Sequence, residues 1–190
     1  MEEPLEILRK LGALQTGHFR LTSGRHSDRY MQCARLFEHP SESEDLCKRL
    51  AGAFQLGGTS ADTVAGPALG GVIMAYEVAR ALGARNIFTE RENGVMTMRR
   101  GFKVERGERV LIVEDVVTTG GSVKEVVEII REAGATVVGI GAIVDRSNGG
   151  VDFGVDFKAL ASLDIKSWDE AGCPLCAQGI PMTKPGSRKV

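Results

Sequence analysis

Residues 110–122 place a buried strand, a polar loop and the start of a helix in immediate succession, and no other stretch constrains the fold as much. The four apolar residues from Val110 to Val113, three of them β-branched, predict a buried strand. Two acids, Glu114 and Asp115, come next, and the segment Val-Val-Thr-Thr-Gly-Gly-Ser leads directly into helical periodicity. In an open parallel sheet such a loop lies beyond the carboxyl end of its strand, where ligands bind.

The composition of this loop favours a phosphorylated sugar as its ligand. The two glycines let the backbone approach a ligand closely, and the free N–H groups at the start of the next helix attract an anion such as phosphate. Glu114 and Asp115 would repel a bare polyphosphate, so we expect them to face sugar hydroxyls or a divalent cation. The competing interpretation is an ordinary strand-to-helix turn in which Thr119 or Ser122 caps the helix. The loop matches neither of the common nucleotide-binding glycine motifs.

The middle of the chain predicts an α/β fold built from two βαβ units. Strand, glycine-rich turn and helix alternate from residue 63 to 89 and again from residue 110 to 144. Asn93-Gly94 predicts a hairpin between the two units. The strict alternation of residues 151–157 predicts an edge strand or a second hairpin.

The length and charge of the chain limit which classes of protein it can belong to. With 190 residues, 43% of them hydrophobic, the chain fits a single domain over residues 1–190, in which residues 1–37 form a small hood and residues 166–190 a surface tail. The 24 basic and 25 acidic residues provide no global positive field, so we expect no nucleic acid partner. No stretch reaches the ~18 apolar residues of a membrane helix, and the first residues are acidic, which predicts a cytoplasmic protein with no membrane partner.

Cys173 and Cys176 form the one C-x-x-C pair among the four cysteines of the sequence. Such a pair can bind zinc together with outside ligands, form a disulfide or cap a turn, and in a reducing cytosol we favour inert thiols. His18 and His26 are each interpreted as residues of solvated turns.

Residues 113–122 resemble the phosphoribosyl-diphosphate (PRPP) signature of the type I phosphoribosyltransferases, and the surrounding chain is similar to the orotate phosphoribosyltransferases of that family. Three further stretches carry the resemblance, namely residues 18–27, 66–71 and 144–146. The resemblance implies an α/β fold, with a type I phosphoribosyltransferase-like parallel sheet flanked by helices and a small N-terminal hood. It also implies a homodimer that converts orotate and PRPP to orotidine 5′-phosphate and pyrophosphate in pyrimidine biosynthesis.

The resemblance also implies which residues bind the substrates. Orotate is expected to contact Thr118, Arg146, Tyr30 and Met31. Arg146 suits the carboxylate of orotate, because an arginine can hold a planar carboxylate with two parallel hydrogen bonds. Mg²⁺ is the expected cofactor, held mainly by PRPP near Asp115, with no direct side-chain ligand. The residues expected to bind PRPP are Glu114, Asp115, Val116, Val117, Thr118, Thr119, Gly120, Gly121, Ser122, Leu69 and Gly70.

The expected catalytic residues are the acid pair and four cations of a flexible lid. Glu114 and Asp115 would orient the ribose hydroxyls and favour positive charge in the transition state. The sequence departs from the family at two positions where the family often has lysine. Thr22 stands at the first, where Arg25 could take over the role of the lysine, and Gly70 stands at the second. The family's lid carries Lys and His, whereas this sequence offers Arg91, Arg99, Arg100 and Lys103.

Two other functions fit the same central motif. One is a phosphoribosyltransferase with a purine or xanthine acceptor, since residues 114–122 read only the sugar phosphate, although Arg146 argues against it. The other is a PRPP-sensing regulator that binds nucleic acid. Near-neutral charge and the lack of an added helix-turn-helix segment argue against the regulator.

Overall fold

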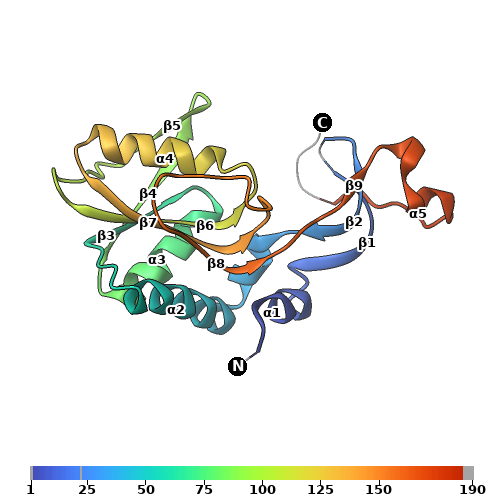
Figure 1. Ribbon diagram of the computed structural model, residues 1–190, viewed down its shortest axis with the longest axis horizontal. Coiled ribbons are helices and arrows are strands. Elements are labelled where there is room, and N and C mark those ends of the chain that lie inside the picture. The colour runs from blue at the N-terminus through green and yellow to red at the C-terminus, as the bar shows by residue number, and fades with distance from the viewer. Residues whose placement is uncertain (1, 22, 186–190) are drawn as a thin grey trace. The chain divides into compact units, whose positions relative to one another are not determined.

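The computed structural model describes residues 2–21 and 23–185, which form two compact units (Figure 1). The first unit combines Met1–Glu38 with Asp164–Val190, and the second comprises His39–Leu163. The sequence predicts one domain with residues 1–37 as a hood, and that organisation stays a prediction. In the described part of the chain, no helix has both the length and the apolar character needed to cross a membrane.

A six-stranded sheet forms the centre of the second unit. All neighbouring strands are parallel except β4 and β5, which pair antiparallel. The predicted hairpin at Asn93-Gly94 joins these two strands and is confirmed, and both turn residues have a positive φ. The strand order is β5 (Val95–Thr97), β4 (Arg85–Glu92), β3 (Thr63–Pro67), β6 (Arg109–Val117), β7 (Thr136–Asp145) and β8 (Phe157–Ser162).

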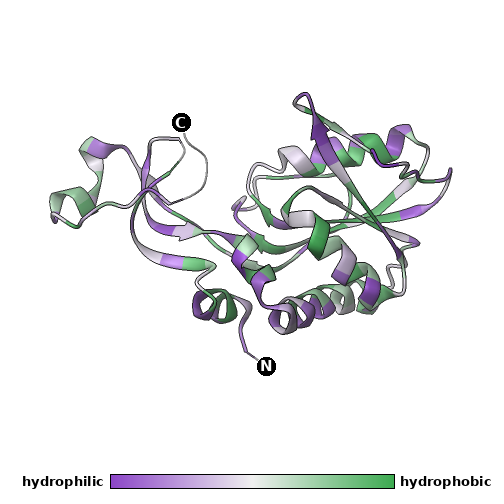
Figure 2. Ribbon diagram, turned by 180° about the vertical axis from the view of Figure 1, so that it is seen from behind, coloured by the Kyte–Doolittle hydropathy of each residue, from purple (hydrophilic) through white to green (hydrophobic). Residues whose placement is uncertain are grey.

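Helices cover both faces of this sheet. α2 (Pro40–Leu56) and α3 (Gly70–Leu82) pack together on one face, and α4 (Gly121–Glu132) covers the other (Figure 1). The helices carry both hydrophilic and hydrophobic residues, as amphipathic helices do (Figure 2). Val110 to Val113 of β6 are fully buried between the two layers. The predicted α/β fold with a mostly parallel sheet is confirmed.

The order of the parallel strands defines where a ligand can bind. Taken in sequence order, β3, β4, β6, β7 and β8 are the first to fifth parallel strands, so their spatial order is 2-1-3-4-5. The order reverses between β3 and β6, where the chain leaves β3 for α3 on one face and β6 for α4 on the other. In open α/β sheets the crevice beyond the carboxyl ends of the strands at this reversal is the usual ligand site.

The edge of the sheet differs from the prediction for residues 151–157. These residues form an irregular segment, and the edge strand β8 begins only at Phe157. The Asp152 carboxylate accepts a hydrogen bond from the Gly154 N–H at 2.8 Å, and Gly154 has φ +68°, so the chain turns here. The prediction of a strand here is therefore wrong, because Phe153 is buried beneath a loop rather than in a strand.

The first unit is a small antiparallel sheet with short helical segments. Its strands lie in the order β1 (Leu14–Arg20), β2 (His26–Met31) and β9 (Ser167–Trp168). Because β9 pairs with β2, residues 164–185 belong to this unit. Most of residues 169–185 are exposed, and the surface tail from residue 166 stays a prediction. The helical segments are α1 (Pro4–Lys10), η1 (Cys33–Glu38), η2 (Glu170–Gly172) and α5 (Pro174–Ala177).

Gly139 and Gly141 of β7 let α2 approach the sheet closely. A Cβ at Gly139 would lie 2.7 Å from Cε1 of the buried Phe54, whereas a Cβ at Gly52, on α2 itself, would meet nothing within 4 Å. We expect Gly139→Ala to lower the free energy of unfolding by about 1–3 kcal/mol through overpacking. The control Gly52→Ala should raise it by about 0.5–1 kcal/mol through helix propensity. Urea unfolding measures both, and equal effects of the two variants would contradict this account of the packing.

Candidate functional site

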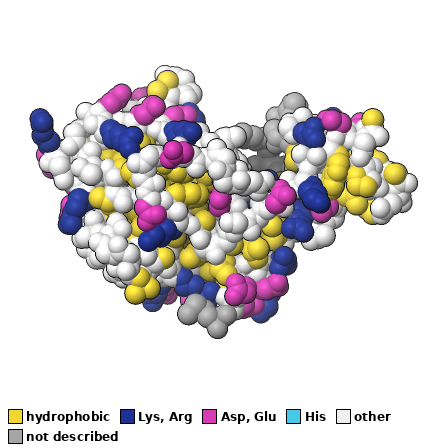
Figure 3. All heavy atoms as spheres, viewed as in Figure 1, with side chains coloured by type: hydrophobic (Ala, Val, Ile, Leu, Met, Phe, Trp, Pro, Cys, Tyr) yellow, Lys and Arg dark blue, Asp and Glu magenta, His cyan; other side chains and the backbone are white. Residues whose placement is uncertain are grey.

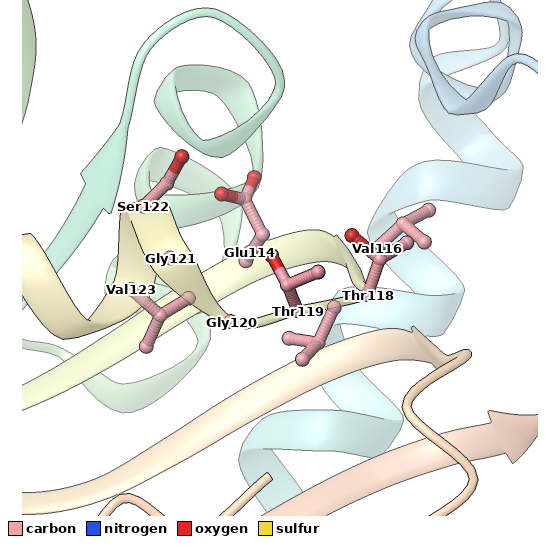
Figure 4. A pocket seen from close by; sticks show the side chains of 9 residues that line it. Glu114, Val116, Thr118, Thr119, Gly120, Gly121, Ser122 and Val123 are labelled. Carbon is pink, nitrogen blue, oxygen red and sulfur yellow. The ribbon is translucent and has the colours of Figure 1, made fainter. Parts of the chain in front are cut away.

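The loop between β6 and α4 forms a pocket lined by Glu114 and residues 116–123. The side chains of Glu114 and Ser122 point to the same side of this loop (Figure 4). Thr118 and Thr119 are exposed, whereas Gly120 is buried. The loop is thus packed against the core through Gly120, and its two threonines are exposed to solvent.

The amino end of α4 is available to a ligand. Its N-cap is Gly120, which has φ 72°, and no side chain of the described residues caps the helix. The first hydrogen bond of the helix runs from the Lys124 N–H to the Gly120 carbonyl, so the N–H groups of residues 121–123 have no acceptor within the helix. An ordinary cap by Thr119 or Ser122 is therefore wrong, and an anion fits this position.

Two residues that the sequence gave no reason to select support this loop. A Cβ at Gly120 would lie 2.8 Å from Cγ1 of Val151 and 2.9 Å from Cε1 of Phe153. The positive φ and this close approach both require glycine at position 120. Val151 and Phe153 lie about thirty residues further along the chain, and local pattern alone does not connect them with the loop.

Glu114 and Asp115 form an uncompensated acid pair at the end of β6. Burial raises the pKa of both carboxyls, and the neighbouring Asp115 raises the pKa of Glu114 further. The Val116 N–H donates to Asp115 Oδ1 at 2.9 Å, yet no ion pair among the described residues includes either acid. The charged form of this pair would be stabilised by sugar hydroxyls, which donate hydrogen bonds, or by a cation.

The glycine-rich turn at residues 66–71 meets this acid pair from the neighbouring strand β3. A Cβ at Gly70 would lie 2.5 Å from Oδ2 of Asp115, so the backbone of this turn contacts the carboxylate edge directly. Gly66 and Gly71 pack backbone against backbone, the Ala68-Leu69 peptide bond is cis, and Leu69 is 87% exposed. The structure therefore brings together two loops that lie more than forty residues apart in the sequence.

Arg146 lies beside the same loop, immediately after β7. Its backbone N–H donates to the Val117 carbonyl at 2.8 Å, and Asp145 pairs with Val117 across the two parallel strands. The Asp145 carboxylate accepts a hydrogen bond from the Ser147 N–H at 2.7 Å. Position 146 is thus adjacent to the start of the loop that contains Thr118 and Thr119.

The four predicted lid cations lie on or just after the β4–β5 hairpin and are ion-paired. Arg91 donates to Glu125 of α4 at 2.9 Å and to the Gly94 carbonyl at 2.7 Å. Met96 of β5 is buried in the core of the unit, so the hairpin is anchored. The other pairs are Arg99–Glu92, Arg100–Glu90 and Lys103–Glu105.

The remaining predicted site residues belong to the first unit. Tyr30 and Met31 lie on β2 and are partly buried, and the Tyr30 hydroxyl donates to Gln32 at 2.8 Å. Thr22 lies outside the described residues. Arg25, the suggested substitute for a family lysine, donates to Ser167 and Asp169 with all three guanidinium nitrogens, an arrangement typical of a structural role.

Comparison with known proteins places these features in one family. Residues 35–178 match the family model of the phosphoribosyl transferase domain. The chain belongs to the phosphoribosyltransferase family. The orotate phosphoribosyltransferase of Pelotomaculum thermopropionicum is 59% identical over 189 residues, which cover 100% of this chain and 98% of that protein. That of Thermotoga maritima is 60% identical over 183 residues, which cover 96% of this chain and 97% of that one.

A solved structure agrees with the sequence comparison. The crystal structure of orotate phosphoribosyltransferase from Aeropyrum pernix superposes with a TM-score of 0.68 at 29% identity, over 83% of this chain and 92% of that one. The resemblance to the orotate enzymes that the sequence motifs indicated is confirmed by these relatives. Within the phosphoribosyltransferase fold, the loop after β6 and the turn after β3 occupy the reversal of strand order.

The raised pKa values of the acid pair predict a stability cost at neutral pH. A carboxyl whose pKa is raised on folding holds its proton longer in the folded state, so stability falls as pH rises from the ordinary carboxyl range towards the raised pKa. We expect Glu114→Gln to raise the free energy of unfolding of the ligand-free protein by about 1–3 kcal/mol at pH 7, and to have little effect near pH 4.

Urea unfolding across this pH range measures the effect of Glu114→Gln. Glu128→Gln, on the exposed face of α4, is the matched control and should leave the free energy of unfolding within about 0.5 kcal/mol of the wild type. A Glu114→Gln protein that is less stable than the wild type at pH 7 would show that the pair is stabilised by folding rather than strained by it.

Proposed function

We propose that this chain is an orotate phosphoribosyltransferase, which transfers the ribose 5-phosphate group of PRPP to orotate and releases pyrophosphate. The observation that carries the proposal is the convergence of the acid pair, the open amino end of α4 and the turn at residues 66–71 at one crevice. The full-length identity of 59–60% to relatives named orotate phosphoribosyltransferase supports the choice of orotate as the acceptor.

The sugar phosphate of PRPP is held by the loop after β6. Its 5′-phosphate accepts hydrogen bonds from the free N–H groups at residues 121–123 and from the hydroxyls of Thr118, Thr119 and Ser122. Glu114 and Asp115 accept hydrogen bonds from the ribose hydroxyls. Because pyrophosphate departs with the bonding electrons, the ribose ring becomes cationic in the transition state, and the adjacent carboxylates stabilise that charge. No protein nucleophile is needed.

The pyrophosphate end of PRPP lies against the turn at residues 66–71, whose backbone, including that of Leu69 and Gly70, supplies hydrogen-bond donors. Mg²⁺ is the cofactor of this proposal, and the acid pair fits it, because two partly buried carboxylates without a cationic partner favour a divalent ion nearby. When bound with PRPP, Mg²⁺ offsets the negative charge that grows on pyrophosphate. The ion would be held mainly by PRPP, with Asp115 nearby.

Orotate is recognised through its carboxylate by Arg146. The position of this residue beside Val117 supports the role, since the base must reach the anomeric carbon of a ribose held by the neighbouring loop. Thr118, in the neighbouring loop, is the second base contact of this proposal, and the contacts of orotate with Tyr30 and Met31 stay predictions. Bidentate hydrogen bonding of a carboxylate by arginine would select orotate over bases that lack this group.

The lid assignment remains a proposal in which Arg91, Arg99, Arg100 or Lys103 approaches the pyrophosphate. The exposed ion pairs of the last three residues contribute little stability, so their release costs little. Arg91 and Arg100 are held by two hydrogen bonds each, Arg91 to α4 and to its own turn, and Arg100 to Glu90. A homodimer and a cytoplasmic location likewise stay predictions.

A base-specificity assay tests the proposed reaction. Purified full-length protein with Mg²⁺ and PRPP should consume orotate and leave adenine, guanine, hypoxanthine and uracil unchanged, because only orotate offers a carboxylate to Arg146. Chromatographic separation of bases and nucleotides measures this, with PRPP omitted as the control. Turnover of a purine would favour the purine or xanthine enzyme, and PRPP-dependent nucleic acid binding without turnover would favour the regulator.

The face seen in Figure 3 argues against the regulator, because acidic and basic side chains are interspersed there without a continuous basic area. The balance of 24 basic and 25 acidic residues agrees with this view. Nucleic acid binding of ordinary strength needs several clustered cations.

Two variants separate the base half from the sugar half of the site. Arg146→Ala should raise the KM for orotate by about 10- to 100-fold, the loss expected for charged hydrogen bonds, with a much smaller change in the KM for PRPP. Asp115→Asn should impair the PRPP side instead. Steady-state kinetics measure both, and Arg131→Ala, an exposed arginine of α4, is the control. Unchanged orotate kinetics in Arg146→Ala would remove this residue from the base pocket.

A further inference from the structure

Four potential metal ligands converge inside the first unit. They are His18 on β1, His26 on β2, Cys173 just before α5 and Cys176 within α5, and their ligand atoms all lie within 4.8 Å of one another. His18, His26 and Cys173 are buried, with 2–3% of each residue exposed. The interpretation of the histidines as solvated turn residues is therefore wrong.

Four of the six distances between these atoms are close to the edges of a zinc-centred tetrahedron, and all six are within 4.8 Å. With usual zinc bond lengths, such edges measure about 3.3 Å between two nitrogens and about 3.6 Å between nitrogen and sulfur. His18 Nε2 and His26 Nδ1 lie 3.2 Å apart. The Cys173 sulfur lies 3.5 Å from His18 Nε2, and the Cys176 sulfur lies 3.7 Å and 3.2 Å from the two imidazole nitrogens. A single ion at the centre would reach all four.

The tautomer of His18 is fixed in the form that ligates a metal. Its Nδ1 lies 2.8 Å from the Ile180 carbonyl oxygen. A carbonyl only accepts hydrogen bonds, so Nδ1 must carry the proton, and the lone pair of the neutral ring then lies on Nε2, which faces the cluster. A backbone carbonyl that orients a histidine through its other nitrogen is the usual outer partner of a metal-binding imidazole.

The backbone conformation around the cluster explains why these four side chains point toward one another. The β1–β2 pairing shifts register between Thr16 and Phe19, and this irregularity places both His18 and Phe19 on the buried side, which regular alternation forbids. Around the cysteines, the Ala177 N–H donates to the Cys173 carbonyl, and the Gly179 N–H donates to the Cys176 carbonyl. The next residues return to β1, where the Thr183 N–H donates to the His18 carbonyl at 2.8 Å.

We propose that His18, His26, Cys173 and Cys176 bind one structural zinc ion. Two thiolates balance the charge of Zn²⁺, and two neutral imidazoles complete a four-ligand set that leaves no position for a substrate. The first unit has a limited core, and the 125 residues of the second unit separate its two halves in the chain. The ion joins β1 and β2 to the C-terminal segment, as metals do in small units that lack a large core.

Metal analysis of untagged full-length protein tests this proposal. After dialysis against metal-free buffer, the wild type should retain one zinc per chain, measured by plasma mass spectrometry. Cys173→Ala and Cys176→Ala should each lose it. The matched controls are Cys33→Ala and Cys47→Ala, which change buried cysteines that are not among the four ligands and should keep the ion.

A second measurement does not depend on the variants folding. Removal of zinc from the wild type with a strong chelator should lower Tm by at least about 5 °C, since a bound ion stabilises only the folded state. Added Zn²⁺ should restore Tm, whereas Mg²⁺ should not. Replacement by Co²⁺ should give the visible bands of a tetrahedral site and a thiolate charge-transfer band.

Several results would overturn the assignment. Wild-type protein without bound zinc, iron in place of zinc, or a disulfide between Cys173 and Cys176 would each exclude it. Equal zinc content in the ligand variants and in the two control variants would locate the ion elsewhere. Because these readouts use metal content and thermal stability, they do not depend on which base the enzyme accepts.

Discussion

The contact between Asp115 and the backbone of Gly70 is the constraint on which the rest of the second unit depends. It joins the end of β6 to the turn after β3, where the strand order reverses. Only glycine at position 70 allows this approach, because a Cβ would lie 2.5 Å from the carboxylate. The acid pair therefore lies next to the backbone of this turn and beside the pocket at the amino end of α4. This arrangement suits a molecule that carries a sugar between two phosphate groups.

The parts of this arrangement that are local in sequence could be predicted from it. Val110 to Val113 can only be buried, and the two glycines that follow Thr119 permit a tight turn into a helix, so strand, loop and helix follow from residue types alone. The Asn93-Gly94 hairpin follows for the same reason, since few other dipeptides adopt positive φ at both positions. Parallel strands place their carboxyl ends at one edge, which allowed residues 66–71 and Arg146 to be assigned to the same site.

The parts that depend on distant contacts could not be predicted. Phe153 alternates with polar neighbours as a strand residue would, but its burial is caused by Gly120, thirty-three residues earlier. His18 and His26 appear as polar residues near a turn, and their burial follows from the register shift in β1 and from Ile180, 162 residues away. A C-x-x-C pair signals a metal only when its outside ligands are known. Here the third and fourth ligands come from the opposite end of the chain.

The two polar clusters of this protein solve the same electrostatic problem in opposite ways. At Glu114 and Asp115 burial raises the pKa of both carboxyls, and no described ion pair offsets their charge, so the fold sacrifices stability to keep an attractive site for hydroxyls and a cation. In the proposed zinc site, the protein provides all four ligands itself, and the same kind of desolvated polar group becomes a source of stability. A metal whose four positions are all filled by protein atoms has none left for a substrate, whereas the acid pair keeps its hydrogen-bonding capacity for a ligand.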